Sequence, residues 1–166
     1  MYILREAKSL DDYEAFLALK SQKDAVRWSG FESAPDPLRF KQYYIEKVLN
    51  NPATHLFFLC DDSEESCPIV GYRQYDQMSD LAIEIRGTTI KKSYQGTDAL
   101  AALNTLMRKH YKEKGFISFV TWISEKNKAS EMNTINEGWT KTDTYEIRHL
   151  PLLGGEHKFF KWIKNE

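Results

Sequence analysis

Cysteine is scarce in this sequence, and the few metal-binding side chains are scattered. Cys60 and Cys67 are the only cysteines among 166 residues, and their spacing matches no zinc or redox motif. His55, His149 and His157 stand far apart without cysteines or carboxylates at metal-ligand spacing. We therefore predict no metal site and two free thiols in a reducing compartment, although the two cysteines could face each other across a hairpin.

Long apolar runs and an excess of charge of one sign are also absent. No stretch of about 18 apolar residues suggests a membrane span, and the first residues, MYILREAKSLDDYEAF, are charged too early for a secretory signal. The 23 basic and 24 acidic residues leave a net charge of −1, which gives no positive field to hold nucleic acid. These absences predict a cytoplasmic protein that binds neither membrane nor nucleic acid.

The residues that are present predict one α/β domain over residues 1–166, with a mixed, mostly antiparallel sheet flanked by helices on both faces. One strand-helix-strand crossover between hairpins favours this packing. Strands are expected over residues 2–6, 56–60, 69–75, 81–90, 116–123, 139–149 and 157–164. Helices are expected from Ser9, from Asp36, from Thr97 or Asp98 to Gly115, and over 127–136.

Several details of these elements can be checked against a structure. The first helix has an apolar stripe of Leu10, Tyr13, Phe16, Leu17 and Ala18, and the second has Phe40, Tyr44 and Val48 at every fourth position. Residues 25–37 break this regularity and predict an irregular connection. Gly87 interrupts its strand, which indicates a bulge or a close approach to the backbone.

The junction between the strand ending at Ile90 and the following helix is the first candidate site. Unpaired N–H groups at a helix N-terminus hold phosphates, and Lys91 and Lys92 add positive charge beside them. An ordinary exposed loop with a flexible glycine explains the same segment equally well.

The element order together with I-K-K-S-Y-Q-G-T-D-A-L, residues 90–100, resembles the acetyl-CoA-binding region of the GNAT N-acetyltransferase superfamily. The run VTWISEKNKASEMNTINEGW is similar to the family's next strand, its short helix that begins at an asparagine, and its Gly-aromatic pair. In this sequence Asn127, Gly138 and Trp139 take those places. In the family's Gln/Arg-x-x-Gly-x-Gly/Ala pattern Gln95 matches, whereas Asp98 and Leu100 replace the glycines.

The resemblance implies transfer of an acetyl group from acetyl-CoA to a primary amine of a small molecule. It places acetyl-CoA against Ile90, Lys91, Lys92, Gln95, Gly96, Thr97, Asp98, Ala99, Asn127 and Ser130. At Asp98 a carboxylate can cap the helix and compete with the pyrophosphate for its N–H groups.

The resemblance also suggests the catalytic groups. Glu84 is the candidate general base, unless it is only paired with Arg86, and the Thr88 backbone N–H would stabilise the oxyanion. At the position of the family's acidic tyrosine stands Thr134, whose hydroxyl is a weak acid. Four aromatic residues could shape the acceptor pocket or close a core: Trp28, Phe31, Tyr72 and Tyr75.

Two alternatives remain at this point. The chain could be a GNAT-shaped module that has lost catalysis and serves ligand binding or interaction, or an unrelated α/β domain without a splayed cleft between residues 81–90 and 116–123. An exposed edge strand would allow a homodimer.

Overall fold

The computed structural model describes all residues, Met1–Glu166, and its centre is a seven-stranded sheet in the order β1-β2-β3-β4-β5-β7-β6. Only β4 and β5 pair in parallel, and every other neighbouring pair is antiparallel. The predicted mixed, mostly antiparallel sheet is therefore confirmed. Its strands are β1 Tyr2–Glu6, β2 Thr54–Asp61, β3 Ile69–Gln77, β4 Ala82–Ile90, β5 Ser118–Ser124, β6 Thr140–His149 and β7 Glu156–Asn165.

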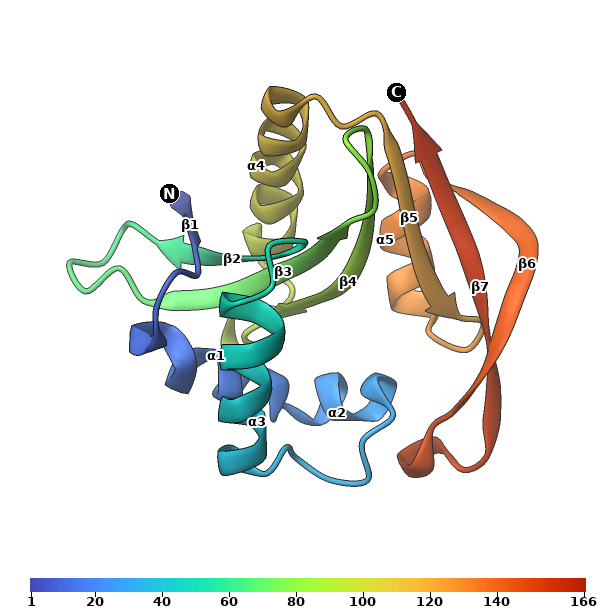
Figure 1. Cartoon of the computed structure of the whole chain (residues 1–166), viewed down its shortest axis with the longest axis horizontal. Coiled ribbons are helices and arrows are strands. Elements are labelled where there is room, and N and C mark those ends of the chain that lie inside the picture. Colours follow the sequence, from blue (N-terminus) through green and yellow to red (C-terminus); the bar gives the residue numbers. More distant parts are fainter.

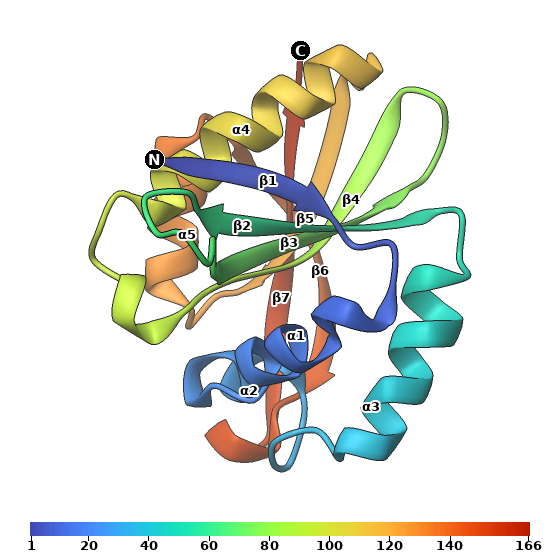
Figure 2. The same cartoon turned by 90° about the vertical axis from the view of Figure 1, so that its left-hand side faces the viewer.

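Helices cover both faces of this sheet (Figure 1). Figure 2 shows α4 on one side of β1, β2 and β3, with α1, α2 and α3 on the other side. The helices are α1 Tyr13–Lys20, α2 Lys23–Ser29, α3 Pro37–Tyr43 with a π-helical continuation over Tyr44–Leu49, α4 Ala99–Lys114 and α5 Lys128–Asn136. None of them is long and apolar enough to cross a membrane.

Two apolar cores lie on opposite faces of the sheet. One packs Leu103 and Met107 of α4 against β2, β3 and β4. The other packs Phe16 of α1 with α3 and its π-helical continuation. Phe40, Tyr44 and Val48 are 6%, 0% and 4% exposed, as their spacing predicted.

The predicted helix ends and the bulge are confirmed. Asp36 caps α3 by accepting a hydrogen bond from the Leu38 amide at 3.2 Å, with Pro37 as the first helical residue. Gly115 ends α4 with φ +82°, a conformation that side chains rarely adopt. On β4 the register against β3 jumps so that Arg86 has no partner beside Gly87.

Two expectations about the first helices are wrong. Residues 23–29 form α2, which has a single buried residue, Val26, and so carries no apolar period. The stripe of the first helix is also shifted. Leu10 is 45% exposed and Ala18 is exposed, while Leu19 is buried, because residues 10–12 form a tighter 3₁₀ turn before α1.

Candidate active site

β4 and β5 separate along their length and leave a wedge-shaped opening in the sheet. Their ladder covers only Ala82–Glu84 and Ser118–Val120, and the last link is Thr121 Oγ1 donating to the Ile85 carbonyl at 3.3 Å. Beyond it β4 pairs only with β3, and β5 pairs only with β7. Figure 1 shows β4 bending away from β5. The structure therefore has the splayed cleft that the unrelated-fold alternative would lack.

The backbone of β4 presents a free N–H group to this opening at Thr88. The Ile90 carbonyl points away from β3, because it accepts from Gln22 and Gln95 side chains at 3.1 and 3.0 Å. The next amide, Lys91 N–H, donates to Val70 of β3 at 2.7 Å. Because successive residues of a strand alternate in direction, the Thr88 N–H points to the same side as the Ile90 carbonyl, where no strand pairs with it.

The loop between β4 and α4 offers a second group of free donors. The amides of Gly96, Thr97, Asp98, Leu100 and Ala101 make no hydrogen bond within the protein. The Ala99 amide instead donates to Thr97 Oγ1 at 3.2 Å. Unpaired amides at the N-terminus of a sixteen-residue helix suit a diphosphate, so the loop fits the anionic part of coenzyme A.

A pocket lies where the two strands part, between α4 and α5. Its walls include Ile85 and Thr88 of β4, Asn104 and Tyr111 of α4, and Ser130 and Thr134 of α5. The neighbouring Asn127 caps α5, because its Oδ1 accepts from the Ser130 amide at 3.2 Å. The structure therefore brings together residues of β4, α4 and α5, which lie far apart in the sequence.

Comparison with known proteins finds this arrangement in solved structures. Neither a family model nor a curated protein matches the sequence. The spermidine N-acetyltransferase of Vibrio cholerae, solved with CoA and spermine, superposes with a TM-score of 0.80 at 12% identity over 99% of this chain and 95% of that chain. This is the GNAT fold.

Two further structures with the GNAT fold match over nearly the whole chain. The ribosomal-protein-alanine N-acetyltransferase of Brucella melitensis has a TM-score of 0.75, 17% identity and 99% coverage of both chains. The yncA protein of Salmonella typhimurium with acetyl-CoA has a TM-score of 0.72 and 15% identity, covering 99% of this chain and 93% of that chain.

Within this GNAT fold, the loop side chains contact other parts of the chain. Gln95 Nε2 donates to Asp24 Oδ2 at 2.8 Å, and the Lys92 amide donates to Gln22 Oε1 at 2.9 Å, so the start of α2 holds the loop. The side chains of Lys91 and Lys92 are exposed beside it.

Asp98 does not cap α4 with its side chain, which corrects the expected competition for N–H groups. Its carboxylate accepts from the Tyr2 hydroxyl at 3.1 Å instead. We therefore expect Asp98 to affect a bound diphosphate only through repulsion between the two negative charges.

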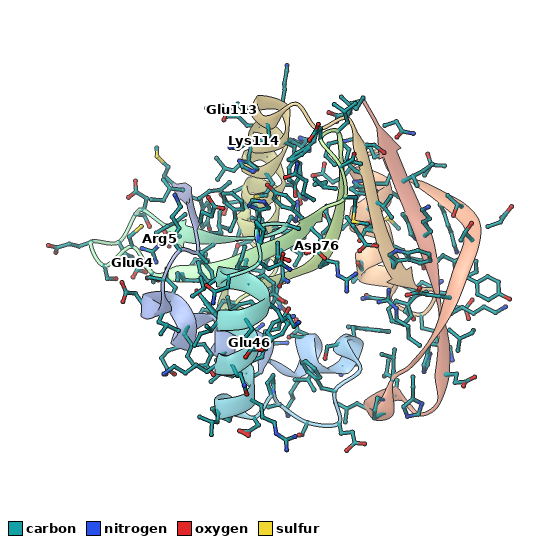
Figure 3. All side chains as sticks on the ribbon, in the orientation of Figure 1. Arg5, Glu46, Glu64, Asp76, Glu113 and Lys114 are labelled. Carbon is teal, nitrogen blue, oxygen red and sulfur yellow. The ribbon has the colours of Figure 1, made fainter.

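Two of the expected catalytic side chains are engaged elsewhere. Glu84 Oε1 accepts from Trp122 Nε1 at 2.8 Å, and Oε2 pairs with Arg86 at 2.7 Å, so both oxygens are occupied. Arg86 also lies 3.7 Å from Asp76, which Figure 3 labels. These contacts match the alternative in which Glu84 is a paired residue.

The Thr134 hydroxyl is also hydrogen-bonded within the protein. It donates to the Ser130 carbonyl at 2.8 Å, one turn earlier in α5, although the residue lines the pocket. A hydroxyl proton held by a backbone carbonyl is poorly placed to protonate a leaving thiolate.

The four expected aromatic residues do not form one pocket. Tyr72 and Tyr75 are 2% and 1% exposed and belong to the two opposite cores, which matches the alternative in which these residues close a core. The Tyr72 hydroxyl lies near Gly87 of β4. The side chain of Trp28 lies half-buried on α2, and Phe31, 36% exposed, follows that helix. The structure gives neither of them a contact to the cleft.

Sequence reasoning missed a buried polar group in the pocket, centred on Arg73 of β3. Arg73 is 8% exposed and donates to Thr88 Oγ1 at 3.0 Å and to Asn104 Oδ1 at 2.7 Å. Burial raises the pKa of Tyr111, another residue of this pocket, and the neighbouring Arg73 opposes the shift. An arginine inside the predicted strand 69–75, where Gln74 is the only other strongly polar residue, was the one available signal.

Proposed function

We propose that this chain is an acetyl-CoA-dependent N-acetyltransferase that acts on a primary amine of a small molecule. The observation that carries the proposal is the free Thr88 N–H at the splayed strands, together with the free amides of Gly96, Thr97, Asp98, Leu100 and Ala101 before and at the start of α4. The GNAT fold of acetyltransferases solved with CoA or acetyl-CoA supports the same assignment.

Each part of the cleft would have a distinct task. The loop amides would bind the diphosphate, and the pocket beside Asn127 and Ser130 would hold the neutral pantetheine arm. The Thr88 N–H would donate to the thioester oxygen as negative charge develops on it, a contribution of roughly 3 kcal/mol for a well-placed donor. Acetyl-CoA supplies the activated acetyl group.

The transfer reaction also requires groups that accept and donate protons. The acceptor arrives as an ammonium ion and first loses one proton to solvent. Its neutral nitrogen then forms the new C–N bond as the C–S bond breaks, and a second proton leaves the nitrogen while the thiolate gains one. Because Glu84 is bound by Trp122 and Arg86 and the Thr134 proton is held by Ser130, we assign both proton transfers to water at the cleft.

A pair of variants at Thr88 tests the proposal. Thr88→Val keeps the backbone N–H but loses the contact with Arg73, whereas Thr88→Pro removes both. Proline is compatible here because the N–H does not pair with β3. We expect Thr88→Pro to lower kcat roughly 100- to 1,000-fold relative to Thr88→Val, with CoA affinity retained. Equal activity of the two variants would contradict the oxyanion role.

The assay measures released thiol with a panel of amines. The neighbours' own names point to acceptors as different as spermidine and the alanine of a ribosomal protein. The panel therefore includes a polyamine, an amino sugar, free amino acids and an N-terminal peptide, and turnover with a free small amine over the peptide is the expected result.

The second candidate function is a binding module without catalysis, and the committed Thr134 hydroxyl favours it. It predicts that no amine of the panel releases thiol and that CoA binds weakly. An interaction role would use β6, one of the two edge strands, where Tyr145 and Ile147 are 48% and 49% exposed; we propose that a homodimer would form through this edge.

A further inference from the structure

The pocket at the splayed strands contains a buried cation that no carboxylate neutralises. Arg73 bonds through Nε and Nη2 to neutral oxygens of Thr88 and Asn104, and its Nη1 has no protein partner. The other charges of the pocket are already paired: Arg108 with Glu137 at 2.6 Å, and Lys164 with Glu166 at 3.3 Å. Burying a positive charge without a counter-ion costs free energy, which a bound anion would offset.

A second group in the pocket also lacks a partner. The Tyr111 side chain lines the pocket and is 5% exposed, and its buried hydroxyl lies beside Arg73 without a regular hydrogen bond. A phenol and a guanidinium beside one another can both donate to one carboxylate. The pocket therefore presents donors, one of them charged, to a group that the protein itself does not supply.

The diphosphate of coenzyme A is too far away to be this anion. The protein amides that would bind the diphosphate lie at the start of α4. Asn104, which accepts a hydrogen bond from Arg73, lies six residues after Asp98 in the helix, a rise of about 9 Å. The pantetheine arm between the two is neutral, and an acetyl group ends in a methyl. Neither group satisfies Arg73.

The remaining walls match a short aliphatic chain. Ile85, Phe119 and Ile123 line the pocket between the parting strands, and Phe119 and Ile123 are 3% and 6% exposed. An acyl group with a few methylenes and a terminal carboxylate would place its carbon atoms against these side chains and its charge at Arg73.

We propose that the acyl donor of this protein is the CoA thioester of a dicarboxylic acid, whose free carboxylate is bound by Arg73 and Tyr111. This inference rests on the proposed function: it keeps the CoA site and the transfer to an amine, and it names an acyl group that the same cleft would take in preference to acetyl. A carboxylate could also belong to the acceptor, but the apolar walls around the strand junction favour the acyl chain.

Calorimetric titration with matched ligands tests the proposal. Succinyl-CoA and butyryl-CoA have acyl chains of the same length that end in a carboxylate and a methyl, and free CoA reports on the rest of the site. We expect succinyl-CoA to bind at least about tenfold more tightly than butyryl-CoA. Equal binding, or tighter binding of butyryl-CoA, would overturn the proposal while CoA binding would still support the proposed function. Absence of binding by all three would overturn both.

Variants locate the effect. Arg73→Met should abolish the preference for succinyl-CoA while free CoA binds as before, and Tyr111→Phe should reduce the preference severalfold. Because the Tyr111 hydroxyl makes no regular hydrogen bond and only approaches Arg73, Tyr111→Phe removes little from the folded protein and remains informative if Arg73→Met fails to fold. Arg5→Met, at an exposed arginine of β1 (Figure 3), is the control and should keep the full preference.

Two results would assign Arg73 differently. If it only supports Thr88 and Asn104, Arg73→Met will melt at a lower temperature and leave the ratio of the two ligands unchanged. If the carboxylate belongs to the acceptor, protein saturated with acetyl-CoA will bind free glutamate in an Arg73-dependent manner, without any preference between acyl chains. Either result overturns the assignment to the acyl group.

Discussion

The charge of Asp98 should weaken the binding of coenzyme A, and Asp98→Asn measures by how much. Asp98 is exposed at the start of α4, where its own amide is one of the free donors. A unit charge about 6 Å away repels it by about 0.7–1.4 kcal/mol at an effective dielectric constant of 80 to 40. Screening at physiological salt roughly halves this energy. We therefore expect Asp98→Asn to bind CoA about two- to threefold more tightly.

The fold should tolerate this change. The Asp98 carboxylate makes no capping hydrogen bond, asparagine is as good an N-cap residue, and its amide oxygen can still accept from Tyr2. Loss of the favourable interaction with the helix dipole should cost less than about 1 kcal/mol of unfolding free energy. Thermal unfolding of the unliganded variant checks this point.

The control is Glu113→Gln, which removes the same charge from the opposite end of α4 (Figure 3). Fifteen residues of helix separate the two sites by about 22 Å, well beyond the Debye length. Titrations of CoA at about 0.05 and 0.5 M salt should show a gain only for Asp98→Asn, and a smaller one at high salt. Unchanged or weaker binding of Asp98→Asn at both salt concentrations would refute the repulsion.

Three further predictions concern the rest of the fold. Phe16→Ala should lose about 3–5 kcal/mol of unfolding free energy by denaturant titration, because this fully buried ring packs between α3 and the sheet. Burial raises the pKa of Cys60 to about 11, so at about pH 8 only Cys67 should react with a thiol reagent in the folded protein, and both in denaturant; two rapid reactions in the folded state would contradict this. Burial, and to a smaller extent the charge of Lys114, lowers the pKa of His110 in the folded protein. As the pH falls below about 6.5, the unfolded chain therefore takes up a proton at His110 that the folded protein does not, and the stability should fall. His110→Gln, which can still accept from Tyr75, should flatten this pH dependence, and an unchanged slope would exclude His110 as its source.

The sequence predicted best the elements whose residues repeat with a clear period. The start of α3 at Asp36 and the end of α4 at Gly115 each carry a local cap signal, so both were correct. The helix α2 buries only Val26 and is held by contacts of Gln22 and Asp24 with the distant loop, which no local pattern encodes.

In the candidate site, the sequence likewise predicted the free backbone amides but not the side-chain contacts. The loop amides follow from a contiguous motif, but the partners of its side chains do not. Asp98 meets Tyr2 across 96 positions of the chain, and Arg73 meets Asn104 across 31. A sequence pattern indicates which backbone N–H groups lack a hydrogen-bond partner at the start of a helix. Side-chain contacts between separate elements depend instead on how the sheet and the helices pack.

The measurement that tests the central claim most directly is thermal unfolding with and without acetyl-CoA. A ligand that binds only the folded protein raises its stability by mass action, by about 2.7 kcal/mol at a hundredfold excess over Kd. The account predicts a rise in Tm that grows with acetyl-CoA concentration. No rise at millimolar acetyl-CoA would contradict a coenzyme A site at the splayed strands.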